Sequence, residues 1–324
     1  MSTSDYKDGV TKSKLEVNLI HNNTTTTTNI VLSVCANCGK EDANNICNKC
    51  KQVRYCNAAC KKVHRSKHKK QCERRAAELH DEKLFKQPPP NEDCPICFLR
   101  IPRLKTGRRY QSCCGKVICS GCVYAPLYDD QGNEVDNQKC PFCRTSFPTT
   151  DEGIERLKQR MEVNDPIAIY NTGNYYRDGR NGYRVDHAKA LELWHHAGEL
   201  GYAEAYCKIG YAYEKGEGVV VDKKKANHYY ELAAMGGNLY ARYNLGLEEE
   251  RVGNMERALN HHMIAVRAGD SDSLKEIQEM YSEGDATKED YMKALQSYQT
   301  YLGEIKSKQR DEAAAFDSEE YRYY

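Results

Sequence analysis

The stretch CANCGKEDANNICNKCKQVRYCNAACKKVHRSKHKKQC, residues 35–72, decides how the first part of this chain folds. It places metal-binding side chains in four close pairs, which are Cys35-x2-Cys38, Cys47-x2-Cys50, Cys56-x3-Cys60 and His68-x3-Cys72. Two tetrahedral zinc ions need eight ligands, and a Cys-x2-Cys turn places two thiolates on one ion. Because cysteines that merely fill a core have no reason to recur at this spacing, the stretch predicts two zinc ions.

This spacing resembles that of a MYND zinc finger over the whole stretch, including the step Tyr55-Cys56 and the distance from Cys60 to His68. In that family, ligand pairs alternate between the two ions. The resemblance therefore implies that one zinc ion is held by Cys35, Cys38, Cys56 and Cys60, and the other by Cys47, Cys50, His68 and Cys72. His64 is a competing ligand, but His68 fits the spacing of the family and is the ligand that we expect.

MYND fingers are protein-interaction modules that often take proline-rich peptides, with a Gln just after the sixth ligand and a Trp before the histidine. Here Lys61 and Arg65 stand at those two places, which is a departure from the family. Residues 51–75 carry ten Lys and Arg against one acid, Glu73, so their local net charge is +9. An acidic peptide or a nucleic-acid backbone is a conceivable ligand. The alternative is a basic helix face that is simply solvated.

A second cysteine-rich block spans residues 94–144 and opens and closes with the elements Cys-Pro-Ile-Cys and Cys-Pro-Phe-Cys-Arg. Its eight thiols are Cys94, Cys97, Cys113, Cys114, Cys119, Cys122, Cys140 and Cys143. The block resembles a RING finger. The cross-brace pairing of that family implies one ion on Cys94, Cys97, Cys119 and Cys122, and another on Cys113, Cys114, Cys140 and Cys143. Such four-ligand sites are closed and structural.

The usual fourth ligand of a RING finger is a histidine, and Lys116 stands at that place here. A Lys ammonium is not a zinc ligand at neutral pH, so the block is nearer to the rarer all-cysteine RING fingers, with Cys113 and Cys114 as third and fourth ligands. Four zinc ions need sixteen ligands. The 16 cysteines without Cys207, together with His68, supply that number.

RING fingers act as ubiquitin ligases by holding the ubiquitin thioester of a conjugating enzyme in a reactive geometry, without a covalent step of their own. The resemblance implies that Ile96 and Pro141 contact the conjugating enzyme and that Arg144 is the donor that bridges enzyme and ubiquitin. This is positioning catalysis, because binding rather than bond formation lowers the barrier. The alternative is that Ile96 only packs and that Arg144 is only a surface charge.

The chain beyond residue 150 is built from repeats. AIYNTG (168–173), AYCKIG (205–210), ARYNLG (241–246) and SLKEIQ (273–278) recur, and they alternate with ALELWHHAG (190–198), ANHYYELAA (226–234), ALNHHMIAV (258–266) and ALQSYQTYL (294–302). Each unit is thus two helices with small residues where they cross, and such units stack into a solenoid. The pattern resembles SEL-one-like repeats, which are related to tetratricopeptide repeats.

Three details of the repeat region extend this prediction. Residues 152–164 have the pattern of an amphipathic helix that caps the front of the solenoid. Trp194 and Cys207 are expected in the core. The histidine pairs 195–196 and 261–262 are expected to pack rather than bind metal, with one member of each pair facing inward, because neighbours on a helix point about 100° apart.

The predicted fold class is therefore multidomain: two small zinc-stabilised modules of treble-clef and cross-brace type, followed by an all-α helical-repeat solenoid. The expected parts are a disordered tail (1–33), a MYND-type finger (34–73), a helical linker (74–91), a RING-type finger (92–147), a solenoid of about four helix pairs (152–304) and a C-terminal tail (305–324). The linker ends at three consecutive prolines, which break a helix.

Composition excludes several other classes of protein. The formal net charge is +1, the hydrophobic fraction is 40% and the mean hydropathy is -0.83. We therefore expect no membrane span, and no positive electrostatic field of the whole chain that would attract nucleic acid. The first ten residues lack the features of a secretory signal. The cysteines are therefore expected in a reducing compartment, intracellular and either cytoplasmic or nuclear.

The sequence predicts a RING-type ubiquitin ligase with about four Zn2+ per chain. The expected partners are a ubiquitin-conjugating enzyme and protein or peptide partners of the MYND finger and the repeats, whereas nucleic acid and membranes are not expected. The alternative is a non-enzymatic zinc-binding scaffold, in which the surface of Ile96, Pro141 and Arg144 engages no conjugating enzyme. No methyltransferase signature accompanies the MYND stretch, so a lysine methyltransferase is excluded.

Overall fold

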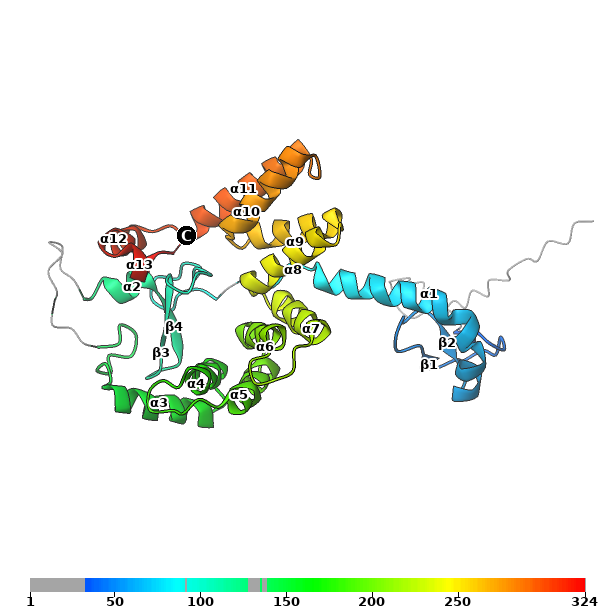
Figure 1. The fold of residues 1–324 in the computed structure, drawn as a ribbon, viewed down its shortest axis with the longest axis horizontal. Helices are drawn as coiled ribbons and strands as arrows, with labels where there is room; N and C mark the ends of the chain where they lie inside the picture. The colour runs from blue at the N-terminus through cyan, green and yellow to red at the C-terminus, as the bar shows by residue number, and fades with distance from the viewer. Residues whose placement is uncertain (1–32, 91, 128–134, 136–138, 324) are drawn as a thin grey trace, which may run out of the picture. The chain divides into compact units, whose positions relative to one another are not determined.

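The computed structural model describes residues 33–90, 92–127, 135 and 139–323. The chain divides into two compact units, residues 1–79 and residues 80–324 (Figure 1). The expected disordered tail, residues 1–33, lies outside the described residues except for Ser33.

The first unit is a small finger built around its cysteines. Strands β1 (Asn45–Ile46) and β2 (Arg54–Tyr55) pair antiparallel, and helix α1 (Ala58–Leu84) begins just after β2. The buried side chains of this unit are mostly cysteines, joined by Tyr55 and Ala43. A unit with so few buried apolar side chains depends on cross-links or metal for its stability.

The second unit contains the second cysteine-rich block, residues 94–144, which is called the RING-like module below. Its centre is a hairpin. Strands β3 (Arg108–Gln111) and β4 (Lys116–Cys119) pair antiparallel, with Arg108 opposite Cys119 and Gln111 opposite Lys116. Helix α2 (Ser120–Tyr124) follows directly. Ile101, Ile118 and Val123 form a small core together with the cysteines of this module.

The repeats form the predicted all-helical solenoid, in which consecutive helices pack against each other. The helices are α3 Thr150–Glu162, α4 Pro166–Asp178, α5 His187–Glu199, α6 Ala203–Lys215, α7 Lys223–Met235, α8 Leu239–Arg251, α9 Met255–Val266, α10 Ser271–Glu283 and α11 Lys288–Ile305. Several begin at a residue whose side chain caps the first turn, such as Asp165 before Pro166. No helix in the described part of the chain combines the length and the apolar character that crossing a membrane requires.

Small residues lie where the helices of a pair cross, as the repeat pattern predicts. A Cβ on Gly173 of α4 would lie 2.6 Å from Nε1 of Trp194 on α5. In the next pair, a Cβ on Gly210 would lie 2.8 Å from the ring of Tyr230. Both distances are shorter than real Cβ contacts, so a large aromatic side chain on the second helix requires glycine on the first.

The RING-like module packs against the inner side of the helical array (Figure 1). The guanidinium of Arg103 donates to the carbonyl of Gly237, which follows α7, at 2.6 Å, and its backbone N–H donates to the hydroxyl of Tyr301 on α11. Arg108 of β3 forms an ion pair of 2.7 Å with Glu204 on α6. Contacts to two helix pairs, α6 with α7 and α10 with α11, mean that the module and the repeats form one unit.

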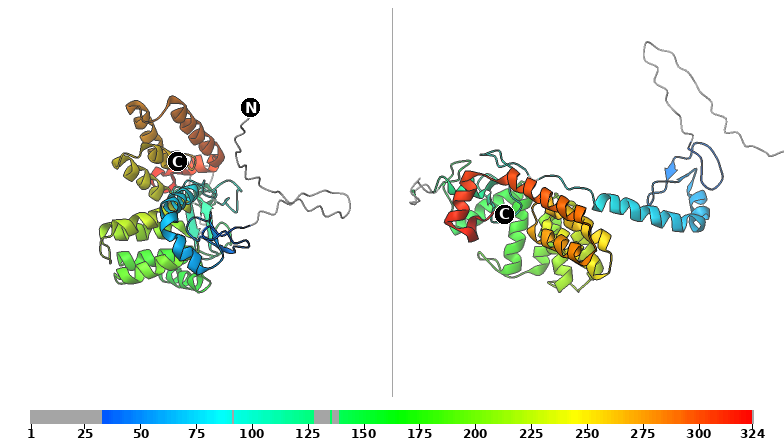
Figure 2. Two further views of the ribbon diagram at one scale, coloured as in Figure 1. Left: turned by 90° about the vertical axis from the view of Figure 1, so that its right-hand side faces the viewer. Right: turned by 90° about the horizontal axis from the view of Figure 1, so that it is seen from above.

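Residues 305–323, expected as a tail, form two further helices, α12 (Lys308–Phe316) and α13 (Ser318–Tyr321). Helix α12 packs against α2 of the RING-like module (Figures 1 and 2). A Cβ on Gly121 would lie only 2.8 Å from the backbone nitrogen of Arg310, so the two helices approach closely because residue 121 has no side chain. The C-terminal helices are thus part of the second unit.

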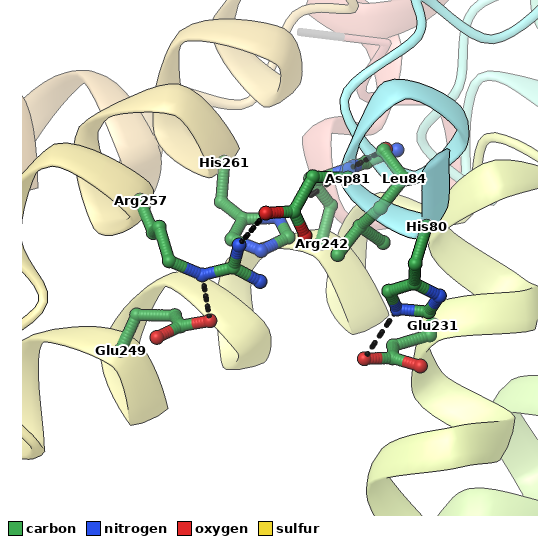
Figure 3. Close-up of polar contacts among 8 residues, drawn as sticks. All are labelled: His80, Asp81, Leu84, Glu231, Arg242, Glu249, Arg257 and His261. Carbon is green, nitrogen blue, oxygen red and sulfur yellow. Dashed lines mark hydrogen bonds and ion pairs between the residues drawn. The ribbon is translucent and has the colours of Figure 1, made fainter. Parts of the chain in front are cut away.

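The end of α1 also belongs to the second unit. Asp81 forms an ion pair of 2.7 Å with Arg257 on α9 (Figure 3). The ring centroids of Phe85 and His261 lie 4.8 Å apart. Leu84 is buried among residues of α7 and α8. Residues 74–91 were expected to be a helical linker. From residue 80 on, this segment instead packs against three helices of the solenoid.

A buried arginine joins this end of α1 to the repeats. Arg242 of α8 is 1% exposed and donates to the carbonyls of Leu84 and Ala234, at 2.7 and 2.8 Å. These carbonyls lie at the C-terminal ends of α1 and α7, which carry partial negative charge. Burial lowers the pKa of Arg242 to about 10, so the cation remains charged at neutral pH and the two helix ends act as its counter-charge.

Replacing Arg242 by Met is expected to destabilise the second unit by about 1–3 kcal/mol, because two buried carbonyls lose their donor. Chemical unfolding measures the free energy, and hydrogen exchange should show faster exchange in residues 80–86. The matched control is Arg251→Met on the same helix, since Arg251 is exposed and forms an ion pair with Glu248 on its own helix. That change should cost at most about 0.5 kcal/mol. Equal losses in the two variants would contradict a special role for Arg242.

The histidine pair of α9 differs from the sequence-based prediction, since both His261 and His262 are fully buried. His261 faces Arg242 and Phe85, whereas the Nδ1 of His262 lies 3.2 Å from the hydroxyl of Ser273 on α10. One member was expected to face solvent, but α9 is covered on two sides, by the end of α1 and by α10. The end of α1 comes from a distant part of the chain, so the local sequence pattern does not show this cover.

Candidate zinc centres and the surface around them

The structure gathers the sixteen candidate ligands into four groups of four. Within each group the ligand atoms all lie within 4.8 Å of one another. The first unit contains Cys35, Cys38, Cys56 and Cys60 in one group and Cys47, Cys50, His68 and Cys72 in another. The second unit contains Cys94, Cys97, Cys119 and Cys122 in one group and Cys113, Cys114, Cys140 and Cys143 in another. This is the grouping that the two family resemblances imply.

The distances between sulfurs fit zinc. In a tetrahedral site with Zn–S bonds of about 2.3 Å, neighbouring sulfurs are about 3.8 Å apart. Three pairs of sulfurs are 3.7 Å apart, namely Cys38 and Cys56, Cys47 and Cys72, and Cys97 and Cys119. All cysteines of the described residues are free, and these separations are far longer than the S–S bond of about 2.05 Å in a disulfide. The donor sets are those of structural zinc sites.

Four of the five Cys-x2-Cys pairs form turns that share one backbone geometry, whereas the fifth pair, Cys119 and Cys122, lies at α2. In each turn the N–H of the residue after the second cysteine donates to the carbonyl of the first cysteine at 2.9 Å, and that residue has a positive φ. These residues are Gly39 (φ 73°), Lys51 (57°), Phe98 (57°) and Arg144 (64°). A positive φ costs a residue with a Cβ about 1 kcal/mol or more. Three of the four turns therefore persist against local preference, as expected where both cysteines bind one ion.

Each group contains one thiol whose pKa is lowered. Burial acts to raise the pKa of Cys35 and Cys47, but backbone N–H groups that point at their sulfurs lower both to about 6. At Cys143, burial is likewise outweighed by the side chain and backbone of Thr145, which lower the pKa to about 6. The thiols of its own group lower the pKa of Cys94. Since the thiolate is the metal ligand, the N–H groups at Cys35 and Cys47 favour the form of these two sulfurs that binds a cation.

The two histidines of the finger take different places. Nε2 of His68 lies 3.2 Å from the sulfur of Cys50, whereas Nδ1 of His64 lies 3.1 Å from the hydroxyl of Tyr55. The structure thus puts His68, and not its competitor His64, among the thiols. His64 instead stacks on His68, with ring centroids 5.7 Å apart, and supports its orientation.

The adjacent cysteines of the RING-like module both reach the same group. The sulfur of Cys113 lies 3.3 Å from that of Cys143, and the sulfur of Cys114 lies 4.0 Å from that of Cys140. They sit in the tight turn between β3 and β4, which brings both side chains to one side. Lys116 is exposed on β4 and lies outside the group.

Replacing either Cys113 or Cys114 by Ser is expected to release one zinc ion per chain. The two cysteines belong to the same site, which keeps only three thiolates after either change. Metal analysis of the purified full-length protein measures the loss. Cys207→Ala is the control, since Cys207 is buried in the repeats and belongs to none of the four groups; it should keep all the zinc. If only one of the two serines lowers the zinc content, the site has a different fourth ligand.

The surface that the RING resemblance predicts to bind a conjugating enzyme lies on two of the Cys-x2-Cys turns. Ile96 packs against the small core, Pro141 is half-buried and Arg144 is exposed. The structure adds two residues that the sequence did not single out: Phe98 is 76% exposed and Phe142 is 42% exposed. The sequence did contain a signal for these two residues. Each is an apolar residue next to a zinc ligand, in a turn that is too short to bury it. The two turns therefore present apolar side chains beside the exposed cation of Arg144.

Arg310 of α12 supports the first of these turns from behind. It is fully buried, and its guanidinium donates to the carbonyls of Arg100 and Ile305 and lies 3.7 Å from the sulfur of Cys97. Hydrogen bonds to ligand sulfurs are part of how proteins orient metal sites. Sequence reasoning missed Arg310 because it lies in the segment taken for a tail.

Family models match the chain in two regions. A MYND finger matches residues 35–72, and Sel1 repeats match residues 166–202, 203–238 and 279–299. The predictions of a MYND finger and of SEL-one-like repeats are thereby confirmed. The two cysteine groups of residues 94–143 are consistent with a RING-like module.

Curated relatives share parts of the chain. The ERAD-associated E3 ubiquitin-protein ligase component HRD3B of Arabidopsis thaliana is 36% identical over 107 residues, which cover 32% of this chain and 16% of the relative. The E3 ubiquitin-protein ligase DA2 of the same plant is 43% identical over 87 residues, or 24% and 20% of the two chains. This chain thus spans a fifth or less of the length of these relatives.

Among solved structures, a Sel1 repeat protein from Oxalobacter formigenes is 28% identical to this chain. The match covers 49% of this chain and 66% of that protein, with a TM-score of 0.42.

Proposed function

We propose that this protein is a RING-type ubiquitin ligase, in which the RING-like module binds a ubiquitin-conjugating enzyme and the MYND finger and Sel1 repeats bind protein partners. The names of the partial relatives HRD3B and DA2 support this assignment. The four donor groups would hold about four zinc ions, which keep the loops of both modules in place and leave no open coordination position for hydrolysis.

The observation that carries the proposal is the shared geometry of the turns at Cys94–Phe98 and Cys140–Arg144. Both turns present apolar side chains at the surface, and the second ends in the exposed Arg144. An apolar surface gives binding, whereas a guanidinium can donate two hydrogen bonds at once. Such a donor can hold the thioester carbonyl region of a bound conjugate in a reactive position, which is catalysis by orientation.

The repeats have a second role in this proposal, as a frame for the RING-like module. Arg103, Arg108 and Arg310 tie the module to α6, to the end of α7 and to the α11–α12 segment. Because the residues around Arg103 already occupy the inner side of the array, partners of the repeats would contact the faces that the module leaves open. The proposal also includes a reducing compartment, cytoplasmic or nuclear, in which these cysteines do not form disulfides.

The test is discharge of ubiquitin from a panel of charged conjugating enzymes by the full-length protein, together with its autoubiquitination. The proposal expects at least one enzyme of the panel to discharge faster in the presence of the protein. If none binds and none discharges, the protein is the alternative, a zinc-binding scaffold without ligase activity.

A further inference from the structure

The MYND finger has a cavity of about 500 Å³ beside its second ligand group. It lies within the first unit, between the hairpin residues Cys47 and Tyr55 and the first turns of α1. Its floor is formed by buried side chains, including Tyr55, His68 and Cys72. The volume is in the range of ligand-binding cavities, about 300–1,000 Å³, and it suits a few side chains of a peptide.

The rim of this cavity is strongly basic. The cations that line it are Lys49, Lys61, Lys62, Arg65 and Lys69, all of them exposed. The side chains of these five residues form no ion pair and no hydrogen bond within the part of the chain that the structure describes. The single acid of the lining is Glu73. Five cations around one concavity raise the local concentration of anions.

The floor of the cavity holds a second, independent feature. His68 is 6% exposed, and its Nδ1 has no hydrogen-bond partner among the described residues. Its Nε2 faces the thiols, so that with zinc on Nε2 the neutral ring carries its hydrogen on Nδ1. Metal-bound histidines almost always donate this N–H to a carboxylate, a carbonyl or water. Because His68 lines the cavity, this buried and unused donor lies next to it. A carboxylate is the strongest neutral-pH acceptor for such a donor.

We propose that this cavity binds an acidic peptide segment, with one Asp or Glu carboxylate accepting from Nδ1 of His68 and neighbouring acids pairing with the basic rim. The inference names the partner class for the recruiting role proposed above for the finger. It does not depend on ligase activity, because binding is measured without ubiquitin.

Two other ligands fit the cavity less well. Single-stranded nucleic acid is held by stacking of bases on exposed aromatic side chains as well as by cations, and Tyr55, the aromatic residue of the lining, is 1% exposed. Proline-rich peptides dock on aromatic-lined grooves, and Lys61 and Arg65 line this cavity in place of such a surface. Charge and the buried donor favour carboxylates.

The binding test uses the full-length protein with zinc bound and a short fluorescein-labelled peptide rich in glutamate. Its glutamine counterpart and a single-stranded oligonucleotide of matched charge are the comparison ligands. Fluorescence anisotropy should show binding of the glutamate peptide and weaker binding of both others. In nitrogen-15 NMR, the Nδ1–H signal of His68 should shift on addition of the glutamate peptide while the zinc content stays unchanged.

The matched variants remove equal charge from the cavity and from the remainder of α1. The pair Lys61→Gln and Arg65→Gln should weaken peptide binding by about tenfold or more. The pair Lys67→Gln and Lys70→Gln should change it far less, because both lysines are exposed on α1 but do not line the cavity. The proposal is overturned by absence of binding, by equal weakening in both pairs, or by tighter binding of the oligonucleotide.

Discussion

Removing zinc from the full-length protein is expected to unfold residues 35–72 and 94–143 while the helices α4 to α9 stay folded. Metal analysis before chelation should return about four zinc ions per chain, one for each donor group. Structural zinc contributes about 10–16 kcal/mol of binding free energy in finger peptides, which becomes folding free energy. The cores of the two modules consist largely of cysteines, so little remains to hold them together without metal.

The structure also predicts what unfolds together with the RING-like module. Helices α12 and α13 should lose hydrogen-exchange protection on chelation at the same time as residues 94–143, because α12 packs on α2 and Arg310 bonds the Cys97 turn. The pair α4 and α5 is the internal control, since its core around Trp194 contains no candidate ligand. Two zinc ions per chain, or unchanged protection of residues 94–143 after chelation, would contradict the assignment.

Replacing Arg144 by Ala is expected to separate activity from stability. All zinc should stay bound, and the strain at this position should be unchanged, since alanine keeps the Cβ that makes its positive φ unfavourable. Ubiquitin discharge, however, should fall on the order of a hundredfold, which corresponds to about 2–3 kcal/mol for one charge-assisted donor in a positioned site. Single-turnover discharge from a charged conjugating enzyme measures this effect.

The matched control is Lys139→Ala, which removes one positive charge from an exposed residue beside the same turn and should leave discharge nearly unchanged. Ile96→Ala should act differently, by weakening the binding of the conjugating enzyme rather than the discharge of bound conjugate. If the wild-type protein is active and Arg144→Ala matches it, Arg144 is only a surface charge, as the alternative holds.

The donor sets of the zinc centres could be predicted from the sequence because their geometry is mostly local. A Cys-x2-Cys turn brings two sulfurs together whatever the remainder of the chain does, so spacing alone identified the pairs at Cys35, Cys47, Cys94 and Cys140. Which pairs share an ion came from the family resemblances, and the structure shows the same groups. The repeats were equally accessible, because period, glycine crossings and cap residues are all local signals.

Only the tertiary structure decided the contacts between segments that lie far apart in the chain. No spacing or periodicity links Arg103 to Tyr301, or Arg310 to the Cys97 turn. Nor does the local pattern of α8 show that Arg242 is buried under the end of α1. In sequence, a charged residue is expected at the surface. Arg242 and Arg310 are buried, and Arg103 is half-buried, because separate segments supply several acceptors around each guanidinium. Such a set of acceptors exists only in the folded chain.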